Sequence, residues 1–145
     1  MTRRAQSAGH VAPDARTVCA YARVRYADTD KMGVAYYANY LVWFEVGRTE
    51  WLRTLGLTYR EVEQSGIILP VVEAHCQYRQ PARYDDELEI RTRGTLLSAV
   101  RVQFDYEIVR QGTGLAAAVG RTVHASVDPA GRPTRLPARV KELFA

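Results

Sequence analysis

The chain has 145 residues, of which 47% are apolar and 25% charged, the balance of a single globular domain rather than of a disordered or fibrous protein. No apolar run approaches the ~18 residues that a membrane span requires, and none follows the basic start of the chain, so we expect a soluble cytoplasmic protein without a secretory signal. The formal net charge is +4, but the arginines are scattered and no basic run carries interleaved aromatic residues, so a small polyanion is a better-supported partner than nucleic acid.

The start of the chain divides into an aperiodic segment and a strand-like one. Residues 1–16 mix Ser, Gly, Pro and Arg, which predicts a flexible lead before a single domain over residues 17–145. From Val18 onward apolar and polar residues alternate, as in a strand with one buried face. The apolar side of this strand comprises Val18, Ala20, Ala22, Val24 and Tyr26. Cys19 and Cys76 fall in strand-like segments without metal-site spacing, which predicts buried free thiols.

A helical segment follows, with apolar residues on nearly every side. These residues are Tyr40, Leu41, Val42, Trp43, Phe44, Val46, Trp51, Leu52 and Leu55. The pattern is typical of a buried helix, with Asn39 as its expected cap and Gly56 as its end. Gly47, inside the helix, costs ~1 kcal/mol of helix propensity relative to Ala, which indicates close backbone packing against a neighbour. Thr58 and Glu61 then form the capping box of a second, short helix.

The rest of the chain, from Ile67 onward, alternates like a series of strands. The expected strands cover residues 72–79, 88–92, 100–108 and 115–127, with a turn at 111–114 and a short closing helix at 140–144. One strand, one long helix and four further strands predict an α+β fold in which a five-stranded antiparallel sheet wraps around the helix. Such a sheet leaves apolar surface and unpaired edges, so we expect pairing with a second copy of the chain.

The segment between the first strand and the long helix concentrates the residues suited to chemistry. It places Asp28, Asp30 and Gly33 within about ten residues of the helix start. Free N–H groups at a helix start can bind an oxygen on which negative charge develops, and a carboxylate upstream can act as nucleophile or general base. This arrangement suits acyl transfer. The alternative is a purely structural role, because Asp-x-Asp before a helix also serves as turn and cap chemistry.

Two longer strings extend this segment. The first reads Arg-Tyr-Ala-Asp-Thr-Asp at 25–30, Gly-Val at 33–34, Tyr-Tyr-Ala-Asn-Tyr-Leu at 36–41, Phe-Glu at 44–45 and Arg-Thr-Glu at 48–50. The second reads Tyr-Arg-Gln-Pro-Ala-Arg-Tyr-Asp-Asp-Glu-Leu at 78–88. Together they resemble the 4-hydroxybenzoyl-CoA thioesterase-like family, which includes the Tol-Pal-associated bacterial acyl-CoA thioesterases. The resemblance implies a hotdog fold, a homodimer or homotetramer, and hydrolysis of acyl-CoA thioesters without a metal or cofactor.

The resemblance also assigns roles to particular residues. The family's catalytic aspartate matches Asp30, three residues before Gly33. Its oxyanion donor, a backbone amide at the helix N-terminus, matches Tyr37. Gly33, Val34 and Tyr36 of the same segment are the expected substrate-binding residues.

Other candidates carry weaker arguments. Asp28 matches a variable position of the family, so we expect it to be structural. His75 and His124 alternate with apolar strand neighbours and are expected at the solvent or at an interface. Glu45 is a second candidate carboxylate, because another branch of hotdog thioesterases uses a glutamate of the helix. The sequence contains no Gly-x-Ser-x-Gly elbow, phosphate-binding glycine loop or zinc-site pattern.

Two other functions stay open on the sequence alone. The first is a thioesterase of the same fold acting on acyl groups bound to a carrier protein in polyketide-type biosynthesis, which the positive charge suits equally well. The second is a non-catalytic acyl-binding protein, although such a protein has no use for the Asp30 carboxylate. The nearby aromatic residues either line an acyl pocket or belong to the core. They are Tyr36, Tyr37, Tyr40 and Trp43.

Overall fold

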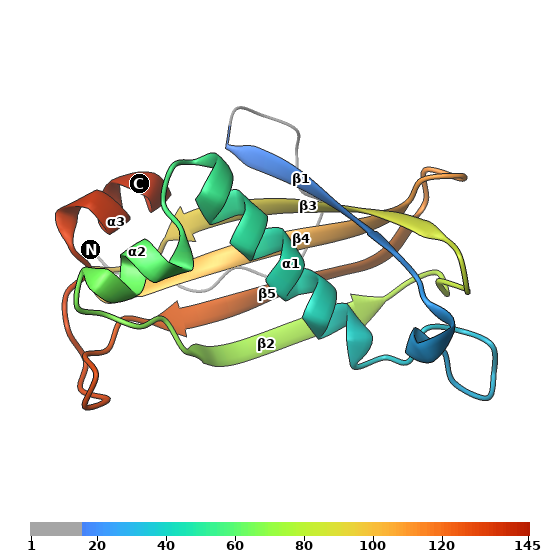
Figure 1. Ribbon diagram of the computed structural model, residues 1–145, viewed down its shortest axis with the longest axis horizontal. Helices are drawn as coiled ribbons and strands as arrows, with labels where there is room; N and C mark the ends of the chain where they lie inside the picture. The colour runs from blue at the N-terminus through green and yellow to red at the C-terminus, as the bar shows by residue number, and fades with distance from the viewer. Residues whose placement is uncertain (1–15) are drawn as a thin grey trace.

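The computed structural model describes residues 16–145, which form one antiparallel sheet with helices on one of its faces and at one end (Figure 1). In chain order the elements are β1 (Thr17–Arg23), the 3-10 turn η1 (Tyr26–Asp28), α1 (Asn39–Thr54), α2 (Tyr59–Gln64), β2 (Val71–Tyr78), β3 (Glu87–Leu96), β4 (Arg101–Arg110), β5 (Ala116–Ala125) and α3 (Ala138–Phe144). The strand order is β1-β3-β4-β5-β2, and every neighbouring pair is antiparallel. The predicted α+β fold, with five antiparallel strands around one long helix, is confirmed.

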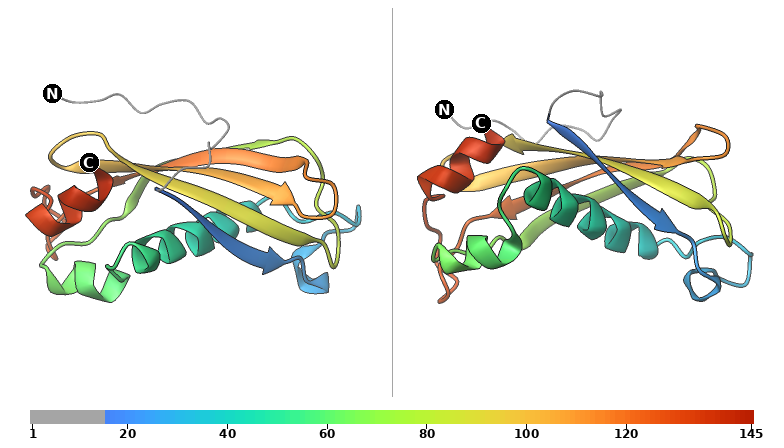
Figure 2. Two further views of the ribbon diagram at one scale, coloured as in Figure 1. Left: turned by 90° about the horizontal axis from the view of Figure 1, so that it is seen from above. Right: turned by 45° about the horizontal axis from the view of Figure 1, so that its top comes forward.

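The long helix α1 lies across the sheet (Figure 2), and one side of it is buried. The buried residues recur every three or four positions: Tyr40, Trp43, Phe44, Gly47, Trp51 and Leu52. Leu41, Val42 and Val46 lie on the other side and are exposed in the single chain. The helix is therefore buried on one face, where the sequence predicted burial nearly all round.

Two glycines allow α1 to approach the sheet closely. A Cβ at Gly47 would lie 2.3 Å from Thr92 Oγ1, so the predicted close packing at this position is confirmed. A Cβ at Gly120 would lie 2.4 Å from Phe44 Cζ, so the ring of Phe44 occupies the space above this glycine. Phe44 also stacks on Tyr106, with ring centroids 4.2 Å apart. The contact between α1 and the central strands depends on these two small residues.

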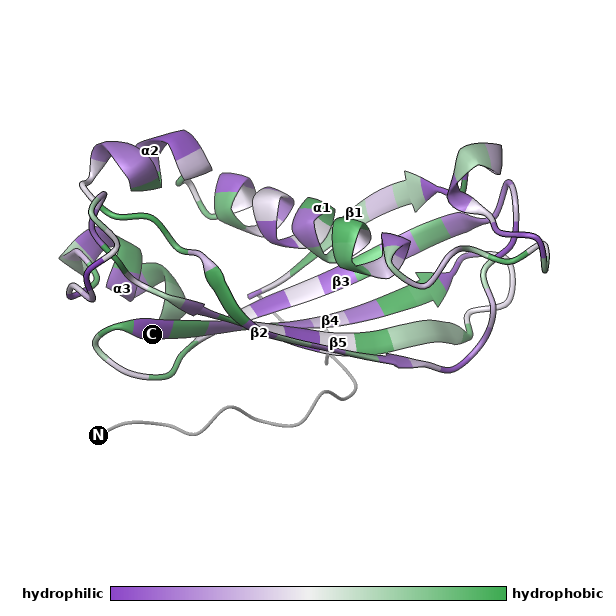
Figure 3. Ribbon diagram, turned by 90° about the horizontal axis from the view of Figure 1, so that it is seen from below, coloured by the Kyte–Doolittle hydropathy of each residue, from purple (hydrophilic) through white to green (hydrophobic). Residues whose placement is uncertain are grey.

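The strands carry alternating hydrophobic and hydrophilic bands, as the sequence predicted (Figure 3). In β5, however, the residues facing α1 are the even-numbered ones. Gly120 lies under Phe44, and Thr122 bonds to Tyr106. The odd-numbered residues Val119 and Val123 therefore lie on the opposite face of the sheet.

Three local predictions are wrong for identifiable reasons. Tyr26 does not continue β1, because the chain turns into η1 after Arg25 and leaves Tyr26 exposed. Cys19 is exposed rather than buried, since strand alternation places it opposite its buried neighbours, and Cys76 is only half-buried. Asn39 is the first residue of α1 and not its cap, because Ala38 takes the N-cap position.

The predictions for the second helix are confirmed, whereas those for the N-terminal lead and the domain limits stay untested. The capping box of α2 is confirmed, with Thr58 Oγ1 accepting from Glu61 N–H and Glu61 Oε1 accepting from Thr58 N–H. No helix within residues 16–145 is long and apolar enough to cross a bilayer. The predicted flexible lead falls almost wholly on residues outside the described part of the chain, so it stays a prediction, as does the single domain over residues 17–145.

Candidate active site

A tight hairpin between η1 and α1 carries Asp30 at the start of its turn. Thr29 and Ala35 pair across the hairpin, and Asp30 N–H donates to the carbonyl of Val34 at 2.9 Å. Gly33 N–H donates to the carbonyl of Asp30 at 3.0 Å. Gly33 adopts a φ of +78°, the left-handed conformation that favours glycine at the end of such a turn. The spacing from Asp30 to Gly33 is thus a requirement of the turn.

The Asp30 side chain is held by the same turn. Its Oδ1 accepts from Met32 N–H at 2.8 Å, which is the usual local bond of an aspartate at this position. The residue is half-buried, and Oδ2 has no hydrogen-bond partner within residues 16–145. One oxygen therefore fixes the carboxylate, and the other stays available.

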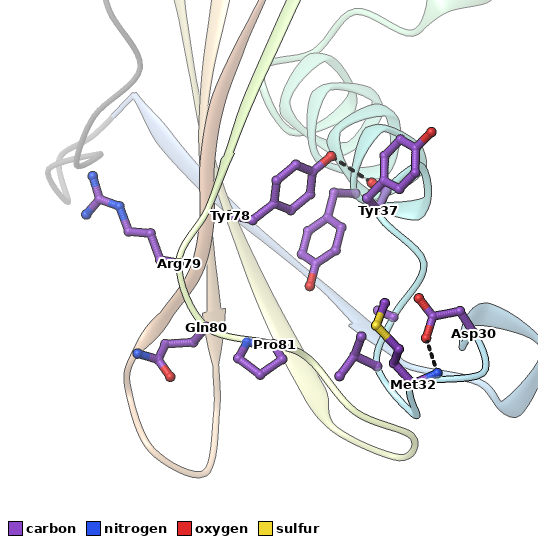
Figure 4. Close-up of a pocket in the computed structure, with 10 residues that line it drawn as sticks. Asp30, Met32, Tyr37, Tyr78, Arg79, Gln80 and Pro81 are labelled. Atoms are coloured by element: carbon purple, nitrogen blue, oxygen red, sulfur yellow. Dashed lines mark hydrogen bonds between the residues drawn. The ribbon is translucent and has the colours of Figure 1, made fainter.

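The Asp30 carboxylate faces a pocket of about 300 Å³ between the hairpin, the start of α1 and the end of β2 (Figure 4). The lining residues are Asp30, Met32, Val34, Ala35, Tyr37, Tyr40, Tyr78, Arg79, Gln80 and Pro81. Among the predicted site residues, Asp30, Val34 and Tyr37 come together at this pocket. Gly33 and Tyr36 are not among its lining residues; Tyr36 packs against Tyr37, with ring centroids 4.6 Å apart.

The start of α1 is anchored on both sides of the Tyr37 amide. Tyr36 N–H donates to the carbonyl of Asp28 at 2.8 Å, and the Asn39 side chain donates to the same oxygen at 2.8 Å. Ala38, at the N-cap, makes no side-chain hydrogen bond. Tyr37 N–H has no acceptor among the described residues, so it is free to bind an oxygen.

Asp28 differs sharply from Asp30 in its surroundings. It is 6% exposed, and its carboxylate accepts from the backbone N–H, Nε and Nη2 of Arg25. Burial works to raise the pKa of Asp28, but the bonds from Arg25 outweigh it and hold that pKa below its usual range. Asp28 thus closes η1.

Three tyrosines line the pocket: Tyr37, Tyr40 and Tyr78. The ring of Tyr78 lies edge-on to Tyr40 at 4.9 Å, and Tyr40 lies edge-on to Trp43 at 5.1 Å. Of the aromatic residues proposed for an acyl pocket, Tyr37 and Tyr40 line it, whereas Trp43 is core. The lining residues at the end of β2, Tyr78, Arg79, Gln80 and Pro81, were not predicted as site residues from the sequence. The sequence feature that could have indicated them is the alternating strand-like segment that ends just before Pro81.

The other titratable candidates lie elsewhere. His124 is 1% exposed and bonds to Thr122 Oγ1 at 2.8 Å and to the carbonyl of Leu69 at 2.9 Å, so its predicted position at the solvent or an interface is wrong. Burial lowers the pKa of His124 to about 4, which keeps the ring neutral. His75 is exposed on β2, and Glu45 lies in a separate hollow on the outer side of α1. Residues 16–145 contain no group of three or more His, Cys, Asp or Glu residues arranged to hold a metal ion.

The sheet wrapped over α1, with a carboxylate beside the helix start, defines the hotdog thioesterases as a class. The chain belongs to the thioesterase-like superfamily, whose family model matches residues 24–144. The family predicted from the two strings at 25–50 and 78–88 is therefore confirmed, and so is the class of enzyme, a thioester hydrolase.

Three similar proteins illustrate the relationship. The acyl-CoA thioesterase YbgC of Haemophilus influenzae is 34% identical over 125 residues, which are 84% of this chain and 90% of that protein. The putative acyl-CoA thioesterase YneP of Bacillus subtilis is 46% identical over 69 residues, which are 48% of this chain and half of that protein. The solved structure of Slr0204, a 1,4-dihydroxy-2-naphthoyl-CoA thioesterase from Synechocystis, superposes with a TM-score of 0.81 at 27% identity, covering 88% of this chain and 95% of that one.

Proposed function

We propose that this protein hydrolyses acyl-CoA thioesters to the free acid and CoA. In this reaction Asp30 is the nucleophile or general base, and Tyr37 N–H is the oxyanion donor. The observation that carries the proposal is the pairing of an available carboxylate oxygen with an unpaired amide at one pocket. The names of the similar proteins above support acyl-CoA as the substrate.

The chemistry follows from that pairing. The thioester carbonyl oxygen accepts from Tyr37 N–H, which stabilises the negative charge that develops when the carbonyl carbon is attacked. If Asp30 attacks, its oxygen bonds to that carbon and the CoA thiolate leaves; water then cleaves the resulting anhydride. If Asp30 is the general base, it takes a proton from the water that attacks, and the thiolate leaves with that proton. Both routes release one acid and one thiol.

The pocket walls suit an acyl thioester. Met32 and Val34 provide apolar surface in the same pocket as Asp30, and Tyr37, Tyr40 and Tyr78 provide aromatic surface. Gly33 and Tyr36 stay proposals as substrate-binding residues. The alternative substrate is an acyl group on a carrier protein, for which the net charge of +4 is equally suitable.

We also propose that the protein works as a homodimer or homotetramer. Within residues 16–145, the strand β2 is at the edge of the sheet and pairs with β5 alone. Its side chains, including Val71 and Val72, are largely exposed. Unpaired strand edges favour association with a second chain. Sedimentation showing only a 16.3 kDa species at micromolar concentration would overturn this assembly. The cytoplasmic location stays a prediction.

A thiol-release assay tests the activity. The panel contains CoA thioesters of increasing chain length and aromaticity, and the same acyl groups on a carrier protein. Release from the CoA esters is the expected result. Release from the carrier protein alone would mean that the substrate is a carrier-bound acyl group and not acyl-CoA. Release from neither would favour a non-catalytic acyl-binding protein. A single turnover in ¹⁸O-water then separates the two routes, since label in the Asp30 carboxylate means an anhydride.

A further inference from the structure

Tyr78 connects the end of β2 to the start of α1. It is the last residue of β2, where the register pairs it with Ala118, and its hydroxyl donates to the carbonyl of Tyr37 at 2.9 Å across 41 residues of sequence (Figure 4). Its ring lies edge-on to Tyr40 and to Tyr37, at angles of 85° and 88°. Partial burial, with the Cys76 thiol nearby, raises the pKa of Tyr78 to about 12. The hydroxyl is therefore protonated and able to donate at neutral pH.

The carbonyl held by Tyr78 has no other short hydrogen bond. Tyr40 N–H reaches the Tyr37 oxygen only at 3.4 Å, whereas the preceding carbonyl, of Tyr36, is reached by the first N–H of the helix at 2.9 Å. On the other side, Tyr36 N–H is tied to the carbonyl of Asp28. Hydrogen bonds thus hold the N–H of Tyr36 and the carbonyl of Tyr37, the groups on either side of Tyr37 N–H. That N–H itself lacks an acceptor within residues 16–145.

The use of a phenol at this place has a physical reason. An ordinary N-cap side chain, such as Ser or Asp, accepts from the N–H groups of the first turn and so occupies them. Ala38 has no such side chain, and Tyr78 binds a carbonyl instead. The helix start is therefore anchored through the carbonyl of Tyr37, and this bond leaves Tyr37 N–H without an acceptor among the described residues.

We propose that Tyr78 is a positioning residue for the hydrolysis: its hydroxyl holds Tyr37 so that Tyr37 N–H stays directed at the thioester oxygen. The inference rests on the proposed function. Deleting one oxyanion donor typically lowers kcat by ~10²–10³-fold. Loss of the hydroxyl leaves the donor present but less well held, so we expect a smaller loss, of ~10-fold in kcat.

The test compares Tyr78→Phe with Tyr84→Phe. The first substitution keeps the ring contacts of Tyr78 and removes only its hydroxyl. Tyr84 is exposed outside the pocket, with its ring edge-on to Tyr26 at 6.0 Å, so it is a matched control. With the acyl-CoA that wild type cleaves fastest, Tyr78→Phe should lower kcat ~10-fold, keep KM within ~2-fold and leave the melting temperature almost unchanged. Tyr84→Phe should behave as wild type.

A second measurement does not depend on turnover. The ¹⁵N order parameter of the Tyr37 amide should be close to the rigid value of ~0.85 in wild type and lower in Tyr78→Phe. Wild-type kcat together with an unchanged order parameter in Tyr78→Phe would overturn the inference and leave the proposed function standing. A variant that unfolds, or loses melting temperature and kcat together, would show that the hydroxyl supports the fold instead, which also overturns it. If wild type releases no thiol from any thioester, the proposed function itself fails, and the order parameter still decides whether Tyr78 holds Tyr37.

Discussion

Asp30→Asn separates the structural role of Asp30 from its proposed chemical role. In wild type, Oδ1 accepts from Met32 N–H at 2.8 Å, and the amide oxygen of asparagine can accept the same bond. The turn should therefore persist, and we expect the free energy of unfolding to change by less than ~0.5 kcal/mol. The substitution removes the negative charge and the nucleophile. We expect kcat to fall by at least ~10²-fold, which corresponds to ~2.7 kcal/mol of transition-state stabilisation.

Asp28→Asn is the matched control, because it makes the same chemical change two residues away. Both Asp28 oxygens accept bonds from Arg25, so an amide there turns one acceptor into a donor that faces a guanidinium group. We expect a melting temperature several degrees lower and a kcat close to wild type. The two variants should therefore show opposite patterns, one losing activity and the other losing stability.

The assays are thiol release at saturating acyl-CoA and thermal unfolding followed by circular dichroism. Near-normal turnover by Asp30→Asn would refute the mechanism, and Glu45 would become the next carboxylate to test. A larger loss of melting temperature in Asp30→Asn than in Asp28→Asn would refute the argument about the turn.

The remaining predictions concern the amide donor, the helix packing and the buried histidine. Tyr37→Phe should keep most of kcat, because the proposed donor is a backbone group; a loss beyond ~100-fold in the thiol-release assay would place the phenol in the chemistry. Gly47→Ala should lower the free energy of unfolding by about 2 kcal/mol in a urea titration. The added methyl would lie 2.3 Å from buried Thr92 Oγ1, and this overlap outweighs the ~1 kcal/mol gained in helix propensity. A stabilised variant would contradict this reasoning. Burial lowers the pKa of His124 from 6.5 to about 4, so its neutral form contributes stability that is complete above pH 6.5 and is lost as the pH falls through about 4. This contribution is on the order of 3 kcal/mol. Unfolding measured between pH 4 and 7 should show a weaker pH dependence in His124→Gln but not in His75→Gln.

The parts of the fold that depend on periodicity were predictable from the sequence. Alternation located the strands, and the apolar segment from Tyr40 to Leu55 located the helix, because one face of that helix packs on the sheet. The close contact at Gly47 was also predictable, because glycine lowers helix stability and is expected inside a helix where a neighbouring element leaves no room for a side chain.

Features that depend on which strands are neighbours were not predictable in this way. His124 is buried because its strand lies in the sheet interior and Leu69 supplies a carbonyl, neither of which appears in the local pattern. The same is true of the candidate site. The segment containing Asp30 and Tyr37 was located from local motifs and the family resemblance, whereas the contribution of Tyr78 depends on β2 returning beside the helix start, 41 residues later.

The turn that holds Asp30 also bears on how this protein can evolve. Aspartate and asparagine codons differ by a single base, and the bond from Met32 N–H accommodates either side chain. One point mutation can therefore silence the proposed chemistry while the turn, the pocket and the fold persist. A duplicated gene that is no longer selected for hydrolysis could therefore come to encode a folded acyl-binding protein through a single substitution. The same base change at Asp28 gives no such route, because there it weakens the bonds to Arg25 that close the 3-10 turn.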